Sequence, residues 1–350
     1  MRNLFAIAML LVGASALKAL TIDTVVVGNP GNSAQSSGNR SHSFGGGDGR
    51  GSVPYSYRIS TFEVTNTQYV EFLNAVDPTG ANALGLYSSS MQTDQRGGIR
   101  FTAAAPAGSK YSTKLNFDDK PVNFVTYYDA ARFANWLTNG QGSGDTEDGA
   151  YTITAAAIAT NSLVRNDFDP LLGNTATEDR WVLPNADEWF KAAFYNPTSG
   201  TYSLYGTNSN VDPTVATASA TGDISNPGAN VANYNNGATW NSIPGNVTTV
   251  GSAGPTSTSG YGAYDMAGNV WEWTEQNFFT SLKVIRGGAL GTAASSMRSS
   301  TSSASSPTDF GGVIGIRLVQ LSAVPEVSYA IFGVLLGLGS LSRRFARRGR

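Results

Sequence analysis

The sequence predicts an irregular α+β domain that is loop-rich, with short helices and little regular structure. Three observations lead to this prediction: forty glycines in 350 residues, three helix-start patterns, and brief apolar runs separated by turn residues. Hydrophobic residues make up 41% of the chain, which at this length is enough to bury a substantial core. We therefore expect one large domain over residues 20–322, flanked by terminal signals at 1–19 and 323–350.

Three short helices are predicted from their first residues. Thr65, Thr126 and Asn185 each precede, by three positions, an acidic or amide residue, as in a capping box. The apolar residues that follow recur at helical spacing, so each helix should bury one face. Core packing explains these faces without a ligand. Their residues are Tyr69, Phe72, Leu73 and Val76, then Ala130, Ala134 and Leu137, then Trp189, Ala193 and Phe194.

The strands are predicted from short runs of β-branched and apolar residues. The first lies at 21–27, and shorter ones are expected at 181–183, 248–250, 284–286 and 314–319. Residues 28–53 are dominated by Gly, Ser and Asn and should form an exposed loop, which contains the single histidine, His42. The long polar segments 139–180 and 202–245 are also expected to be loops, and loops of this length in a compact domain often serve binding.

Composition excludes several classes of protein. With no cysteine there is no disulfide framework, thiol nucleophile or thiolate metal site, and one histidine excludes a two-histidine iron site. Seven of the 23 basic residues lie in the termini (Arg2, Lys18 and the five arginines of 343–350), as does one of the 25 acidic ones, Glu326. Residues 20–324 therefore hold 16 basic and 24 acidic residues, a net charge of −8. Nucleic acid is not an expected partner of so acidic a domain.

Both termini predict export signals. Arg2, an apolar run over 4–12, and the small residues Ala14 and Ala16 form the pattern of a secretory signal peptide, with a buried first strand as the alternative. At the other end, the apolar run 327–341 and the arginines after it predict a short membrane segment with a cytoplasmic stop. A polybasic lipid-binding tail is the alternative.

The C-terminal segment resembles a known sorting signal. Val324-Pro325-Glu326, the apolar run and the arginine tail follow the order of the PEP-CTERM signal of Gram-negative bacteria, although Val327 stands where that signal has a second proline. The resemblance implies processing by exosortase-type machinery. It also implies localisation in the cell envelope, at the cell surface or in the extracellular matrix.

The stretch Ser259–Thr274 departs most from ordinary globular sequence. Asp265 and Glu272 offer carboxylate oxygens, and the glycine-bracketed turn between them can offer the carbonyls of Gly268 and Val270. Such a set of oxygen donors suits a hard cation such as calcium. Alternatively, the two carboxylates accept backbone hydrogen bonds in a tight turn, while the flanking tryptophans Trp271 and Trp273 anchor the core.

The same stretch resembles the signature of the formylglycine-generating enzymes, the sulfatase-modifying factors. Further blocks follow in the family's order: 62–66 (Phe-Glu-Val-Thr-Asn), 120–123 (Lys-Pro-Val-Asn), 181–189 (Trp-Val-Leu-Pro-Asn-Ala-Asp-Glu-Trp), 286–288 (Arg-Gly-Gly) and 315–317 (Gly-Ile-Arg). The resemblance spans about residues 20–320 and implies the formylglycine-generating enzyme fold, a variant of the C-type lectin fold. It also implies that Asp265, Gly268, Val270 and Glu272 surround a calcium ion.

The catalytic residues of that family are missing here. Active members hold copper with two cysteines after the Arg-Gly-Gly block, and the corresponding positions are Thr292 and Met297, while Ala289 replaces a usual serine. A hydroxyl and a thioether cannot replace two thiolates that bind Cu(I), so copper is not expected. The resemblance also implies a second calcium site near Asn233 and the Tyr234 carbonyl, but Ser242 stands where an aspartate is needed, so no second site is predicted.

Two classes of function remain. The first is a noncatalytic exported surface or matrix protein, a calcium-supported scaffold that binds a polysaccharide or protein partner. The second is an enzyme with a relocated, cysteine-independent active site built on carboxylates such as Asp187 and Glu188, or Asp118 and Asp119. Since the first pair fits a helix start and the second a turn, the scaffold is favoured. Two acids converging in a pocket would favour the enzyme.

Overall fold

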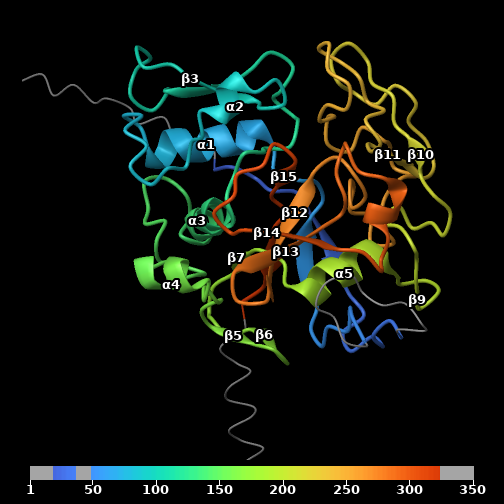
Figure 1. Ribbon diagram of the computed structural model, residues 1–350. Helices are drawn as coiled ribbons and strands as arrows, with labels where there is room; N and C mark the ends of the chain where they lie inside the picture. The colour runs from blue at the N-terminus through green and yellow to red at the C-terminus, as the bar shows by residue number, and fades with distance from the viewer. Residues whose placement is uncertain (1–18, 37–48, 324–350) are drawn as a thin grey trace, which may run out of the picture.

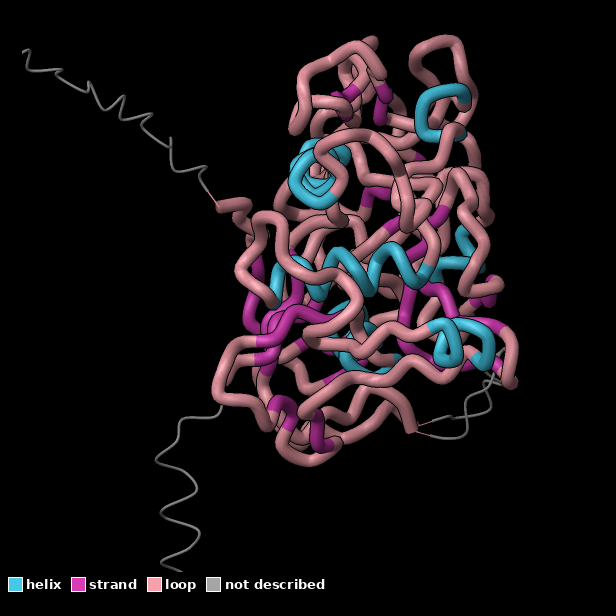
Figure 2. Tube along the Cα trace, turned by 90° about the vertical axis from the view of Figure 1, so that its left-hand side faces the viewer, coloured by secondary structure: helices cyan, strands magenta, loops and turns pink. Residues whose placement is uncertain are grey.

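The computed structural model describes residues 19–36 and 49–323, in which short elements alternate with long loops (Figure 2). The predicted terminal signals, apart from Ala19 and Ala323, and His42 lie outside the described residues. The helices are α1 (Asn66–Val76), α2 (Ser90–Thr93), α3 (Tyr127–Thr138), α4 (Ala155–Thr160), α5 (Ala186–Phe194) and the 3-10 helix η1 (Ala294–Met297). The mixed α+β prediction is confirmed. In the described part of the chain, no helix has the length and apolar character needed to cross a bilayer.

Two four-stranded sheets form the centre of the molecule. The first has the order β1-β2-β16-β7 and the second the order β14-β13-β12-β15. Their strands are β1 (Thr24–Val27), β2 (Tyr57–Ser60), β7 (Arg180–Val182), β12 (Trp271–Phe278), β13 (Leu282–Arg286), β14 (Ser303–Ser305), β15 (Ile314–Gly315) and β16 (Val319–Leu321). In Figure 1, β12 runs through the middle of the molecule, with α1 and α3 on one side and the β10–β11 region on the other.

Four two-stranded sheets lie in the segments around these two sheets. β3 with β4, β5 with β6 and β8 with β9 are antiparallel, whereas β10 with β11 is parallel. Their strands are β3 (Ile99–Phe101), β4 (Tyr111–Thr113), β5 (Phe168–Asp169), β6 (Gly173–Asn174), β8 (Tyr195–Asn196), β9 (Thr201–Tyr202), β10 (Thr214–Val215) and β11 (Val231–Ala232). The predicted long loops at 139–180 and 202–245 therefore contain α4 and several strands too short to predict.

The three predicted capping boxes are present. Thr65, Thr126 and Asn185 each accept a hydrogen bond from the backbone of the third helical residue, whose side chain accepts one from the cap backbone in return. The predicted apolar faces are buried, with only Val76 partly exposed. Between α1 and α3 an aromatic cluster forms, in which Phe72 lies 5.3 Å from Phe133 and 5.4 Å from Trp136 between ring centroids.

Two strand predictions are wrong in instructive ways. No strand forms at 248–250, because the Thr248 N–H donates to the Asn269 side chain and the Val250 N–H to the Asp119 carbonyl instead of to a neighbouring strand. The run 314–319 divides into β15, which pairs with β12, and β16, which pairs with β2 and β7. Between them the chain passes from one sheet to the other, and Arg317 lies at this crossing.

Candidate functional site

The central loop, residues 259–270, leads into β12 through a series of left-handed residues. Asp265, Gly268 and Asn269 have φ values of 55°, 87° and 59°. The Gly268 N–H donates to the Gly287 carbonyl at 2.8 Å, and a Cβ at Gly268 would lie 2.4 Å from the Asn233 carbonyl oxygen. Only glycine fits this approach of two backbones, which fixes how the loop enters the core.

Glu272 lies on β12 and is completely buried. The Nε of Arg317 donates to both carboxylate oxygens at 2.8 and 2.9 Å, and the Trp189 Nε1 donates to Oε2 at 2.5 Å. Arg317 also donates to the carbonyls of Ser60 and Tyr264, at 2.8 and 2.7 Å. This pair therefore ties β12 to α5 and to the crossing between the two sheets.

Glu63 is a site residue that sequence reasoning missed. It is 1% exposed, and its carboxylate accepts hydrogen bonds from the Asn269 Nδ2 at 2.6 Å and from the Val270 N–H at 3.2 Å. It thereby holds the central loop from a position more than 200 residues earlier in the chain. The sequence does contain a sign of this role, because a glutamate directly between the apolar residues Phe62 and Val64 can be a buried, partnered acid.

Three carboxylates thus share one buried region with one compensating cation. Burial, then the charges of Asp265 and Glu272, raise the pKa of Glu63 well above its ordinary value. Burial likewise raises the pKa of Asp265 and of Glu272, and Arg317 opposes both shifts. Carboxylate and carbonyl oxygens such as those of this region are the donors that a hard cation prefers.

The loop also contains the features of a hydrogen-bonded turn. Asp265 Oδ2 accepts from the Gly251 N–H at 2.6 Å, and Trp273 is fully buried with its Nε1 donating to the Val125 carbonyl at 3.1 Å. Among the described residues, no three acidic, histidine or cysteine side chains gather as a metal-holding group. A calcium ion here would therefore depend on the carbonyls of Gly268 and Val270 as well as on two carboxylates.

Around the implied second calcium site, Asn233 donates through Nδ2 to the Asn246 carbonyl at 2.8 Å and to the Asn269 side chain at 3.1 Å. The Tyr234 carbonyl accepts from the Gly237 N–H. Ser242 has a left-handed φ of 60°. Asn233 therefore serves to join two loops to the central one.

The two positions that correspond to the missing cysteines lie together beside Gly288. A Cβ placed on Gly288 would come within 2.5 Å of Met297 and 3.3 Å of the Thr292 hydroxyl. The Thr292 Oγ1 donates to the Ala289 carbonyl at 2.9 Å and accepts from the Ala289 N–H at 3.1 Å. Met297 is buried in an apolar cluster with Tyr205, Ala232, Tyr234 and Ala267. These contacts hold Thr292 in a closed turn and Met297 in a packed apolar cluster.

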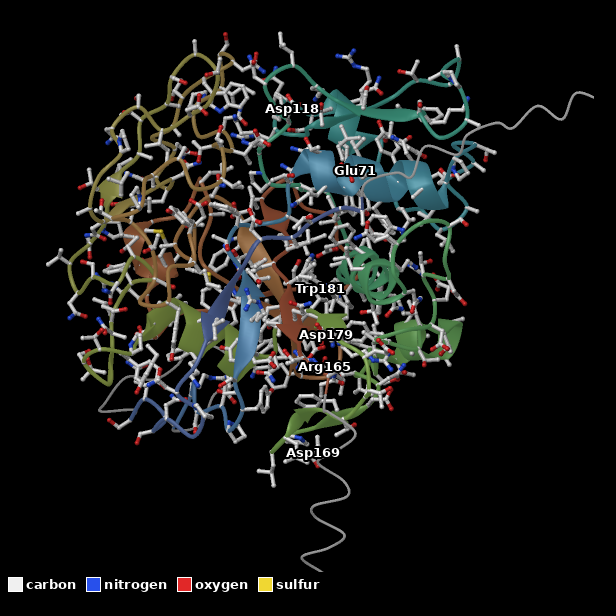
Figure 3. The ribbon with its side chains drawn as sticks, turned by 180° about the vertical axis from the view of Figure 1, so that it is seen from behind. Glu71, Asp118, Arg165, Asp169, Asp179 and Trp181 are labelled. Atoms are coloured by element: carbon white, nitrogen blue, oxygen red, sulfur yellow. The ribbon has the colours of Figure 1, made fainter. Side chains whose placement is uncertain are left out.

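The acid pairs considered for a relocated site do not converge. Asp187 accepts from the Gly51 N–H, and Glu188 is buried in an ion pair with Arg165 at 2.6 Å. Asp118 bonds the Thr113 hydroxyl, and the Asp119 carbonyl holds Val250. Figure 3 places Asp118 at the opposite end of the molecule from Arg165. The carboxylates of Asp187, Glu188 and Asp118 therefore have structural roles, and that of Asp119 is exposed.

Comparison with solved structures gives distant similarities. The crystal structure of CarF matches at 20% identity over 87% of this chain and 99% of that chain, with a TM-score of 0.47. Treponema denticola variable protein 1 matches at 17% identity over 86% and 98% (TM-score 0.46), and PvdO from Pseudomonas aeruginosa at 17% over 87% and 99% (TM-score 0.40). No curated protein sequence matched the chain.

The family model for the sulfatase-modifying factor enzyme 1-like domain matches residues 15–321, which is most of the chain. The match includes both four-stranded sheets, the central loop and the positions of the two missing cysteines. On this evidence the chain belongs to the sulfatase-modifying factor enzyme 1-like domain family.

Proposed function

We propose that this protein is a noncatalytic, exported member of its family that serves as a calcium-supported binding scaffold. The observation that carries the proposal is the pairing of Thr292 with Met297 beside Gly288, at the two positions where thiolates would hold copper. The Thr292 side chain closes a turn, and the Met297 side chain packs in an apolar cluster. The scaffold is kept while its metal-binding chemistry is replaced.

Copper does not fit this pair of side chains. Cu(I) is selected by soft anionic sulfur, and a hydroxyl bonded within its own turn supplies neither softness nor charge. Met297 alone offers a single neutral thioether in a packed cluster. The oxidation of a cysteine substrate therefore has no metal to support it in this protein.

The purified domain, given copper, oxygen and a peptide with the sulfatase cysteine motif, should produce no aldehyde. The matched variant is Thr292→Cys/Met297→Cys, which should gain competition with a chromogenic Cu(I) chelator because both side chains meet at Gly288. The unmodified domain should not compete. Copper-dependent aldehyde formation by the cysteine-free protein would overturn the proposal.

Calcium is proposed to bind through the carboxylates of Asp265 and Glu272 and the carbonyls of Gly268 and Val270. The ion would supply positive charge to a region where three carboxylates share one arginine. Its role would be structural, holding the central loop against β12. The Arg317 and Trp189 contacts of Glu272 would orient that carboxylate.

Calcium should raise the melting temperature of the domain, because a ligand that binds only the folded state stabilises it by about 2.7 kcal/mol at a hundredfold excess over its Kd. Asp265→Ala should remove this dependence. Asp118→Ala, at an exposed turn position, is the matched control and should keep it. A wild-type melting temperature that EDTA leaves unchanged would mean that the loop is only a hydrogen-bonded turn.

Export is proposed from the two terminal segments, with exosortase-type machinery acting on residues 324–350 and a polysaccharide or protein as the partner of the displayed domain. Deleting residues 324–350 should release the domain into the medium, because the apolar run and the arginine tail would no longer hold it at the membrane. Immunoblotting of medium and envelope fractions measures this. Unchanged retention in the envelope would show that another segment anchors the protein.

A further inference from the structure

A cavity of about 460 Å³ lies between the segment 162–170, the start of α5 and parts of β12 and β13. This volume is in the range of small-molecule sites. Its walls divide into an apolar side and a polar side, formed by Leu163, Phe168 and Pro170 and by Glu275, Asn277 and Lys283.

Lys283 is a buried amine that lines this cavity. The residue is 1% exposed, its Nζ donates to the Glu275 backbone carbonyl at 3.2 Å, and the amine lies 4.4 Å from the centre of the Tyr127 ring. Within the described residues it makes no ion pair, whereas buried ammonium groups are usually paired. The hydrogen-bonding capacity of this amine is therefore mostly unused.

Burial favours the neutral form of the Lys283 amine, and groups that can carry protons lie near it. Burial lowers the pKa of Lys283 to about 8, against the opposing charge of Glu275. The carboxylate of Glu275 is held by Tyr151 and Arg165, and burial raises the pKa of Glu275. The Tyr127 hydroxyl is buried without a hydrogen-bond partner among the described residues. Arg165 also pairs with Glu188, so its charge is already balanced.

We propose that Lys283 is a nucleophile that captures a small aldehyde or ketone in this cavity as a Schiff base. The amine nitrogen attacks the carbonyl carbon to form a C–N bond and gives up its two protons. The carbonyl oxygen takes up two protons in exchange, its bond to carbon breaks, and it leaves as water. The product is an imine, and no oxidant or reductant is consumed. Glu275 lines the cavity and can carry protons there. This site goes beyond the proposed scaffold function and does not rest on it.

The test uses benzaldehyde with sodium cyanoborohydride, which reduces an imine to a stable secondary amine that peptide mass mapping locates. The matched lysine is Lys191, which is also buried, with its pKa likewise lowered to about 8 by burial, and which bonds the Asn29 carbonyl at 2.9 Å but does not line the cavity. Lys283 should be labelled at least tenfold faster than Lys191. The rate should rise with a midpoint near pH 8, because only the neutral amine attacks.

Two variants test whether labelling depends on the cavity or only on the low pKa of the lysine. Lys283→Arg should abolish the label, and Ala186→Leu, which fills the cavity at the start of α5, should slow labelling at Lys283 and leave Lys191 unchanged. If Lys283→Arg does not fold, the labelling rates of Lys283 and Lys191 in the wild-type protein still test the proposal. Labelling of Lys283 no faster than that of Lys191, or unaffected by Ala186→Leu, would overturn the proposal.

Discussion

Arg317→Met should lower the free energy of unfolding by about 3–5 kcal/mol, because it leaves a buried carboxylate without its partner. Both members of the Arg317–Glu272 pair are fully buried, 2.8 Å apart. Glu63 and Asp265 are further acids in the same region, and neither can replace the charge of the arginine. Urea denaturation in EDTA, monitored by tryptophan fluorescence, measures the change without a contribution from calcium.

The control is a more exposed arginine–carboxylate pair. Arg298 and Asp212 are 3.1 Å apart, with side chains 40% and 58% exposed, so Arg298→Met should cost no more than about 1 kcal/mol. The double variant Arg317→Met/Glu272→Gln should recover part of the loss, since it removes the unpaired charge. Equal effects of Arg317→Met and Arg298→Met would show that the buried pair does not anchor the two sheets.

The helices could be predicted because their signals are local. Thr126 and Asp129 are three residues apart, and the side chain of each bonds the backbone of the other in the folded protein. Such a reciprocal arrangement depends on little outside the first turn. The apolar spacing after each cap then gave the buried face.

The contacts that assemble the candidate site could not be predicted in this way. Glu63 and Asn269 are 206 positions apart, and only the folded chain brings them within 2.6 Å. The same reason explains the failure at 248–250, where β-branched residues bond to loops and side chains. Arg317 interrupts an apolar run that otherwise predicts one strand, because the chain changes sheets there.

The residues proposed to bind calcium are close in sequence, but their surroundings could not be predicted. Asp265, Gly268 and Val270 lie in the loop before β12, and Glu272 lies on β12 itself. The sequence did not indicate that Glu272 is bonded by Arg317 and Trp189, because both partners come from distant elements. The cavity at Lys283 was also missed, since a lone lysine in a strand carries no pattern.

Gly268→Ala should be the most damaging single-methyl change in the central loop. Two costs combine there: a left-handed φ of 87°, which disfavours a side chain, and a Cβ only 2.4 Å from the Asn233 carbonyl oxygen. The clash is with backbone, so no side chain can move to relieve it. The parallel bridge between Asn233 and Gly268 would have to open.

Gly262→Ala is the matched control within the same loop. Its φ of 88° is nearly identical, but its Cβ would meet only Val25 at 3.9 Å, an ordinary contact. The control should therefore cost about 1–2 kcal/mol from backbone conformation alone. Gly268→Ala should cost about 2–3 kcal/mol more, in the range of strongly overpacked sites. Urea denaturation of both variants in EDTA gives the difference. Equal losses would mean that the loop yields at Gly268, and that its contact with Asn233 does not fix the approach to β12.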